Sequence, residues 1–165
     1  MNLDTCKKIA VELTAALGTL APSALVLSSS CAGVDTMEAG KQLAEAFSAQ
    51  RIKAAVLDCR DESPAGVEAA LKALLPEVSV SLDTAAPVLP AAGVNTVVDL
   101  LYRHFAVTIL VTRCLRQSNT AMLLAAASQN VLLLEQKKLS RTDEIDETVE
   151  IIRNLQAKPL GFVLQ

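Results

Sequence analysis

The stretch SALVLSSSCAGVDTMEAGKQLAEAF, residues 23–47, decides the fold. It opens with SALVLSSS, which is typical of a short buried strand that ends in a turn of small residues. The segment Thr36–Gln50 is rich in alanine and places its larger apolar side chains on one helical face. A strand, a small-residue loop and a helix in this order form the context of a phosphate-binding loop. We therefore expect the functional site near the end of this strand.

The rest of the chain repeats the alternation of short apolar runs and helical segments. The runs are continuous in Val, Leu and Ile, which is typical of a parallel sheet buried on both faces. We expect an α/β fold of three layers, with a mainly parallel sheet and helices on both faces, in one domain over residues 1–165. Beyond the first strand, the expected strands are Ile52–Asp58, Val78–Leu82, Ala106–Thr112, Asn130–Glu135 and Leu160–Leu164. The other expected helices follow Asp4, span Pro64–Leu75, start at Asn95, span Thr120–Ser128 and follow the cap Ser140.

Composition excludes several classes of function. The net charge of -3 and the 2% of aromatic residues argue against nucleic-acid binding. No apolar run reaches the roughly 18 residues of a membrane span, so direct membrane insertion is not expected. The single histidine and four cysteines without a CxxC spacing predict no metal site. No signal peptide is evident, so we expect a cytoplasmic protein with free thiols.

Gly40 and Lys41 resemble the end of a phosphate-binding loop. The chemistry of such a loop needs a Ser or Thr next, as a magnesium ligand, and Gln42 cannot serve as one. Asp35 and Glu38 would also place negative charge beside a polyphosphate. We interpret Lys41 as a solvated helix lysine, with a nucleotide-binding switch as the alternative.

Three stretches of the chain resemble the cytoplasmic P-loop domain of bacterial tyrosine kinases (BY-kinases). The segment Thr120–Gln165 is similar to the family's C-terminal pattern without gaps, Val88–Gly93 (VLPAAG) resembles its VLPAG passage, and Ser28–Ser30 stands where the family has TSSxPGEGKST. The resemblance implies a P-loop NTPase-like fold related to the MinD/ParA ATPases. It also implies a place in capsule and exopolysaccharide synthesis or export.

The phosphate-loop positions depart from the family pattern. The segment Leu43-Ala44 resembles the family's NLA and sets the register. In this register Thr36 replaces the Walker A lysine, Met37 the hydroxyl residue and Asp35 the preceding glycine. Of the loop glycines, Gly33 remains.

The Walker A′ and Walker B positions depart as well. The family's Asp-x-Asp becomes Asp58-Cys59-Arg60, so the second aspartate is Arg60. The segment VIIDTPP becomes TILVTRC, so Val111 replaces the magnesium-organising aspartate and Thr112 follows it. The only tyrosine, Tyr102, lies in an expected helix rather than in the tyrosine cluster that the kinases phosphorylate.

These losses predict a protein that is not an enzyme and holds no cofactor. Phosphoryl transfer depends on positioning and on charge neutralisation by lysine, magnesium and backbone donors. We expect a non-catalytic interaction or regulatory subunit in exopolysaccharide biosynthesis, located in the cytoplasm or at the inner membrane face through a partner. The resemblance implies a membrane polysaccharide co-polymerase or a related active kinase as that partner. The alternative is a nucleotide-binding switch or an ATPase of the MinD/ParA type, with an unorthodox loop around Lys41.

Three weaker hypotheses concern other residues. The charged segment Asp58–Glu62 follows a strand and could form a small polar site. Cys31 precedes a helix, but the single His104 is distant in sequence, which disfavours a Cys/His nucleophile. The first helix carries an apolar stripe suited to packing on the sheet or, where it is exposed, to a second copy of the chain. Its members are Ile9, Leu13, Ala16, Leu17 and Leu20.

Overall fold

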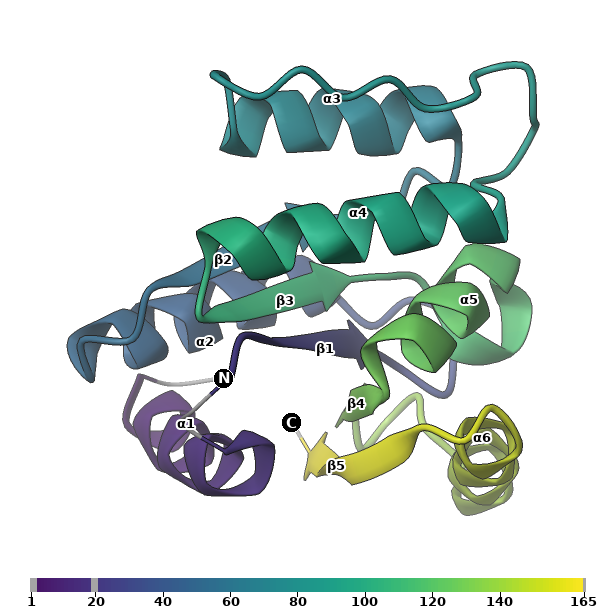
Figure 1. Cartoon of the computed structure of the whole chain (residues 1–165). Helices are drawn as coiled ribbons and strands as arrows, with labels where there is room; N and C mark the ends of the chain where they lie inside the picture. Colours follow the sequence, from purple (N-terminus) through teal and green to yellow (C-terminus); the bar gives the residue numbers. More distant parts are fainter. Residues whose placement is uncertain (1–2, 19–20, 165) are drawn as a thin grey trace.

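A computed structural model describes residues 3–18 and 21–164 (Figure 1). Its sheet has five parallel strands in the order β2-β3-β1-β4-β5. The strands are β1 (Ser23–Ser28), β2 (Ala54–Asp58), β3 (Val107–Val111), β4 (Asn130–Glu135) and β5 (Lys158–Leu164). The helices are α1 (Leu3–Leu17), α2 (Thr36–Ala49), α3 (Pro64–Leu74), α4 (Ala91–His104), α5 (Asn119–Ser128) and α6 (Thr142–Asn154), with a 3-10 turn, η1, at Leu115–Gln117.

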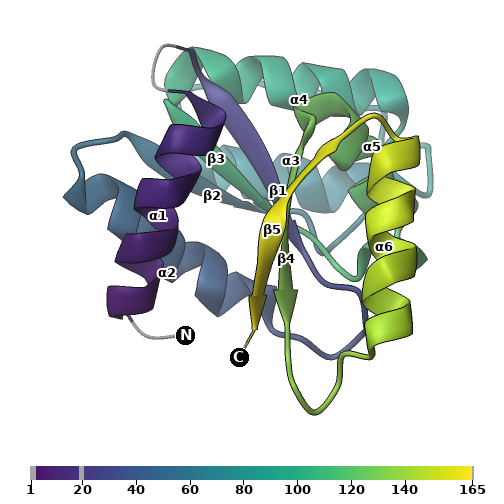
Figure 2. The ribbon, with the colours of Figure 1, turned by 90° about the horizontal axis from the view of Figure 1, so that it is seen from below.

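The sheet lies between two layers of helices. One buried cluster joins α1 and α2 to one face, and a second joins α3, α4, α5 and α6 to the other. Figure 2 shows α1 and α2 on one side of the strands and α5 and α6 on the opposite side. The expected three-layer α/β fold with a parallel sheet is confirmed, and its cause is visible in β3, where every residue is buried.

Local capping explains where several helices begin. The Asp35 carboxylate accepts a hydrogen bond of 3.0 Å from the Met37 backbone N–H and caps α2. Ser63 caps α3, with Pro64 in its first turn. Ser118 caps α5 through the Ala121 N–H. These caps fix the directions in which the chain leaves the strand ends.

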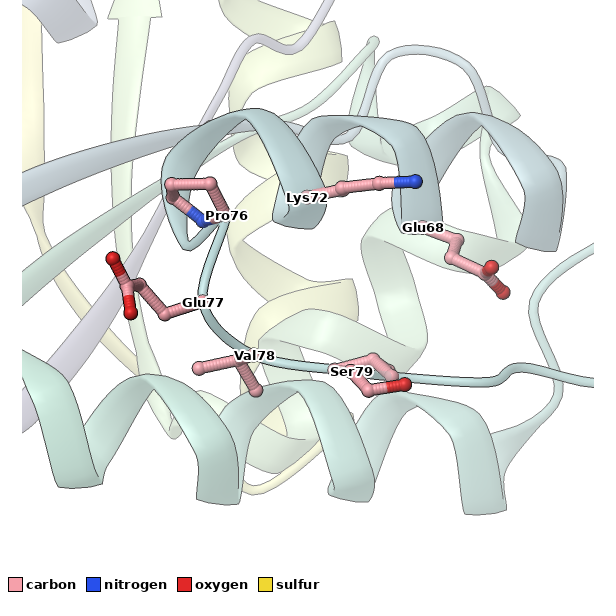
Figure 3. Close-up of a pocket in the computed structure, with 7 residues that line it drawn as sticks. Glu68, Lys72, Pro76, Glu77, Val78 and Ser79 are labelled. Atoms are coloured by element: carbon pink, nitrogen blue, oxygen red, sulfur yellow. The ribbon is translucent and has the colours of Figure 1, made fainter.

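The expected strand Val78–Leu82 is wrong. Exposed serines alternate in this segment with half-buried or buried apolar side chains, but it pairs with no described strand. It runs between α3 and α4 instead, as Figure 3 shows for Val78 and Ser79. The Leu82 N–H donates to the Glu68 carboxylate at 3.0 Å rather than to a sheet. The alternation reflects packing on helices and not strand pairing.

Three expected helix starts are also wrong. The helix α1 already includes Leu3, so Asp4 lies in its first turn and not at its cap. The helix α4 begins at Ala91, after Pro90, so Asn95 lies inside it and not at its cap. The helix α6 begins at Thr142, and its cap position is Arg141 without a side-chain bond. The Ser140 hydroxyl is engaged elsewhere, as described below.

The apolar stripe of α1 belongs to the core. Leu13 is only 3% exposed, while Ile9 and Leu17 are half-buried against the same cluster. Ala16 is exposed, and Leu20 lies outside the described residues. The expectation that this stripe offers a docking face is therefore not supported, because α1 uses it to cover the sheet.

The strand ends define where a site can form. All five strands are parallel, so the ends of β1, β2, β3 and β4 meet at one edge of the sheet, the carboxyl edge. Ligands of open α/β sheets bind at this edge. Among the described residues, no helix combines the length and apolar character needed to cross a membrane.

Candidate functional site

The loop after β1 is held by a buried carboxylate from the neighbouring strand β4. Ser30 donates its backbone N–H to Glu135 Oε1 at 2.9 Å and its hydroxyl to Oε2 at 2.7 Å. Glu135 is the last residue of β4 and is 0% exposed. In a phosphate-binding loop such backbone donors face the phosphate. Here the donor of Ser30 faces an anion that belongs to the chain itself.

Ser140 completes the surroundings of this carboxylate. Its hydroxyl donates to Glu135 Oε2 and accepts the Gln136 backbone N–H at 3.0 Å. The Cys31 thiol lies 3.5 Å from the same hydroxyl. Glu135 therefore receives three donors from two loops and ties the turn after β4 to the loop after β1. Hydrogen bonds to a charged acceptor inside a protein are stronger than neutral ones.

Other groups at the end of β1 and in the loop after it bond to the segment that follows β3. The Cys114 thiol donates to the Ser30 carbonyl at 3.2 Å, and the Leu115 N–H donates to the Ser29 carbonyl at 3.1 Å. The Ser28 hydroxyl donates to the Arg113 carbonyl at 2.6 Å. Loops that follow β1 and β3 are thus bonded to each other.

The loop keeps one feature of a phosphate loop. Gly33 has a φ of 90°, a conformation that favours glycine. Asp35, two residues later, directs its carboxylate to the first turn of α2 and places a negative charge at that helix end. This negative charge interacts favourably with the dipole of α2.

Thr36 and Met37, expected at the Walker A lysine and hydroxyl positions, open α2. Thr36 is 2% exposed, and its hydroxyl donates to the Thr112 carbonyl at 3.1 Å. Met37 packs against the apolar cluster beneath α2. Neither side chain offers a cation to a phosphate, so the start of α2 lacks the charge that the chemistry requires.

Gly40 and Lys41 lie inside α2 and not at the end of a loop. A Cβ added at Gly40 would lie 2.7 Å from Cγ2 of Val111, so this glycine lets α2 approach β3 closely. The expected position of Gly40 and Lys41 at the end of a phosphate-binding loop is therefore wrong, because the backbone there is helical. Lys41 is exposed, and its charge contributes to lowering the pKa of Asp58.

Val111 ends β3 next to this glycine, and Thr112 follows it. Val111 is fully buried and fills the space between β3 and α2 with a branched apolar side chain. Thr112 is 1% exposed, and its hydroxyl donates to the Arg113 carbonyl at 3.1 Å. The sheet edge offers no carboxylate at these two positions.

Asp58 and Arg60 form an ion pair at the end of β2. The guanidinium donates from Nε to Oδ1 at 2.9 Å and from the terminal Nη2 to Oδ2 at 2.7 Å. This hydrogen-bonded guanidinium lowers the pKa of the Asp58 carboxyl, and the pair raises the pKa of Arg60. A second carboxylate, Asp35, lies 3.9 Å from the same guanidinium. The positive charge of the Arg60 side chain thus lies between the carboxylates of Asp58 and Asp35.

The other weak candidates do not assemble into a site. Asp61 accepts the N–H and hydroxyl of Ser63 and serves the turn before α3. Burial raises the pKa of the Cys59 thiol to about 12, which leaves it unreactive. His104 ends α4, which leads into the start of β3, whereas Cys31 follows the carboxyl end of β1. Within residues 3–18 and 21–164, no group of three His, Cys, Asp or Glu side chains could hold a metal.

Glu135 and Ser140 were missed as site residues by sequence reasoning. The available signal was an acidic residue at the end of an otherwise apolar run, NVLLLE. Such a residue at the end of an inner parallel strand must find donors, and the adjacent loops supply them.

Comparisons with known proteins address the fold. No family model matches the sequence, and no curated protein matches it. Among solved structures, the chain shares its fold with P-loop kinase domains. These include the kinase domain of the Escherichia coli tyrosine kinase ETK (TM-score 0.76, 10% identity, 99% of this chain and 74% of that one) and the VpsO kinase domain (0.70, 16%, 99% and 95%).

A third neighbour is the chimerical protein CapA2B2, with a TM-score of 0.72, 18% identity and coverage of 98% of this chain and 83% of that one. The resemblance to the P-loop domain of bacterial tyrosine kinases is therefore confirmed at the level of the fold. At these identities the likeness concerns the arrangement of helices and strands.

Proposed function

We propose that the chain is a non-catalytic relative of the BY-kinase domain that acts by binding another protein of an exopolysaccharide system. The observation that carries the proposal is the position of Glu135. Its carboxylate takes the N–H and hydroxyl of Ser30, in the loop where a kinase of this fold holds phosphate. A phosphate there would meet a buried like charge, which is strongly unfavourable.

The surrounding positions support the same proposal. Thr36 supplies no cation, Val111 supplies no magnesium ligand, and Arg60 is already bonded to Asp58. Losing a single electrostatic group of this kind typically costs about 3–4 kcal/mol of transition-state stabilisation. The loss of several together leaves surface binding as the function that the fold can still perform.

The resemblance to BY-kinases suggests two partners of stated chemistry. One is the cytoplasmic segment of a membrane polysaccharide co-polymerase, and the other is an active kinase of the same fold. The proposal places the chain in the cytoplasm, at the inner membrane face when such a partner is bound. Neither partner requires this chain to hold a nucleotide.

A phosphotransfer assay and a binding assay test this function together. The purified chain is incubated with ATP and Mg²⁺, and intact-mass spectrometry measures the phosphate added to it. The only tyrosine in the sequence, Tyr102, is half-buried on α4. We expect no added phosphate, whereas an active BY-kinase domain in a parallel reaction modifies itself. Stoichiometric phosphate on the isolated chain would contradict the proposal.

The binding assay uses the cytoplasmic segment of a membrane polysaccharide co-polymerase and an active kinase of the same fold, both taken from the organism of this chain. Analytical ultracentrifugation of each mixture is expected to show a complex with at least one of them, with or without ATP. Failure to form a complex with either, at concentrations of tens of micromolar, would refute the partner assignment.

A further inference from the structure

A cavity lies at the amino edge of the sheet, opposite the edge that carries the loop after β1. It has a volume of about 370 Å³ and lies where α1 and α2 end and where β2 and β3 begin. Small-molecule pockets typically have volumes of about 300–1,000 Å³. The cavity therefore has the size of a small ligand, and no strand end of the carboxyl edge contributes to it.

The walls of this cavity are apolar and its charged groups are cationic. Leu17, Ile52 and Val107 supply the apolar surface, and Arg51 and Lys53 are the charged residues that line it. Among the described residues, no acidic side chain lines it, although the chain has 18 acidic and 15 basic residues. The local charge is therefore opposite in sign to that of the whole chain.

The two cations are free to meet an anion. In the described part of the chain, the Arg51 side chain makes no ion pair and no hydrogen bond. The Lys53 ammonium lies 5.2 Å from the centre of the Phe105 ring and also has no carboxylate partner there. An exposed guanidinium beside a hydrophobic wall suits a carboxylate, which it can bind with two parallel hydrogen bonds.

One buried donor lies beside the same cavity. Thr14 lines the wall and donates to the Ala10 carbonyl at 2.7 Å, and its hydroxyl is 3.5 Å from Oε1 of Gln50. Nε2 of that glutamine is buried and has no partner. Buried polar groups without a partner are uncommon in proteins. Because this nitrogen is buried and Gln50 does not line the cavity, it lies behind the cavity wall, and the proposal below rests on the lining residues alone.

We propose that the amino-edge cavity binds a small amphipathic carboxylate, with its apolar body against Leu17, Ile52 and Val107 and its carboxylate at Arg51 and Lys53. A polyphosphate or a sugar does not fit this lining, because most of its polar groups would lie against apolar walls. The site is separate from the loop after β1, so this proposal does not depend on the proposed function.

Three probes of equal chain length test the class of ligand. Octanoate, 1-octanol and octylamine are titrated below their aggregation concentrations, and binding is followed by amide chemical shifts. We expect saturable shifts at residues around Ile52 and Val107, with octanoate binding more tightly than octanol and octylamine binding least. Equal affinities for all three, or no saturable shift with octanoate, would overturn the proposal.

Paired charge variants separate the site from general electrostatics. The double variant Arg51→Asn and Lys53→Gln removes both cations, and asparagine tolerates the φ of 62° at position 51. We expect its affinity for octanoate to fall roughly five- to tenfold, the effect of two partly exposed ion pairs. The matched control, Lys137→Gln with Lys138→Gln, changes the net charge equally on an exposed turn and is expected to leave binding unchanged.

A filling variant tests the cavity itself. Ala106 lines the cavity immediately before β3, and Ala106→Phe narrows the cavity while both Arg51 and Lys53 are kept. Octanoate binding is expected to be lost while the amide spectrum remains that of the folded chain. Unchanged affinity in both the filling and the charge variants would place the probe elsewhere and reject the site.

Discussion

Glu135 and Asp58 occupy equivalent places in the fold, since each is the last residue of a parallel strand. Glu135 ends the inner strand β4 and is fully buried, with donors from the loops after β1 and β4. Asp58 ends the outer strand β2, and its side chain is 35% exposed beside Arg60. The same type of residue is thus satisfied by neutral donors in one place and by a cation in the other.

The difference shows how position in the sheet decides what a carboxylate contributes. An exposed ion pair is screened by water and typically contributes about 0–1 kcal/mol. A buried carboxylate that joins two loops cannot be replaced by solvent, so its loss leaves donors without partners. We infer that Glu135 determines the shape of the loop after β1, whereas the Asp58–Arg60 pair sets the charge pattern at the surface.

Removal of the buried carboxylate is expected to have the largest effect. Glu135→Ala should lower the free energy of unfolding by about 3 kcal/mol or more, because the donors of Ser30 and Ser140 lose their acceptor. Urea denaturation measures this change. Glu150→Ala, at an exposed position of α6, is the matched control and should change stability by less than about 0.5 kcal/mol. A similar, small loss in both variants would mean that burial does not distinguish the two kinds of acid.

An intermediate loss of stability is expected from a substitution where α2 packs on β3. Gly40→Ala should lower the free energy of unfolding by about 1–3 kcal/mol, because the new methyl group would overlap Val111. The double variant Gly40→Ala with Val111→Ala makes room for that methyl group. Its loss of stability should be smaller than the sum of the losses in the two single variants. Strict additivity in denaturation experiments would show that the contact between α2 and β3 does not depend on this fit.

The smallest effect is expected at the exposed pair. Arg60 lowers the pKa of Asp58, so this ion pair stabilises the fold above the ordinary aspartate pKa of about 4 and loses that contribution as the pH falls below it. In Arg60→Gln the pKa of Asp58 should rise towards its ordinary value, with a stability change below about 1 kcal/mol. Carboxyl-carbon NMR titration measures the pKa.

Two further variants calibrate that titration. Lys41→Ala should raise the pKa of Asp58 less than Arg60→Gln does, because Lys41 is the smallest of the causes that lower it. Arg141→Gln removes an exposed arginine beside Asp143 and should leave Asp58 unaffected. A pKa of Asp58 that does not move in Arg60→Gln would contradict the role assigned to the guanidinium.

The sequence allowed the strands and their parallel arrangement to be predicted, because buried parallel strands are continuous apolar runs. Asn130–Glu135 was predicted with its observed bounds for this reason. Val78–Leu82 was wrongly predicted as a strand, because its alternating pattern indicates half-burial and cannot reveal whether the neighbour is a strand or a helix. Local patterns therefore predict the layers better than they predict the pairing.

The site was predictable only where a motif exists. Asp58 and Arg60 were predicted as positions of interest from the family pattern, and the structure brings them together. Ser30, which donates to Glu135, lies 105 residues away from it along the chain, and no local rule connects the two. Ser140 was expected to cap a helix, but its hydroxyl donates to the buried Glu135 carboxylate instead. Long-range hydrogen bonds of this kind need the three-dimensional structure.

Calorimetric titration of the intact chain with ATP and Mg²⁺ tests most directly whether the loop after β1 is closed to phosphate. We expect no saturable heat up to millimolar nucleotide, because Glu135 holds the Ser30 donor and no lysine opens α2. An active BY-kinase domain titrated under the same conditions provides the positive control. Saturable binding with a Kd of about 1 mM or tighter would contradict a closed loop, and its loss in Lys41→Ala would assign the binding to that lysine.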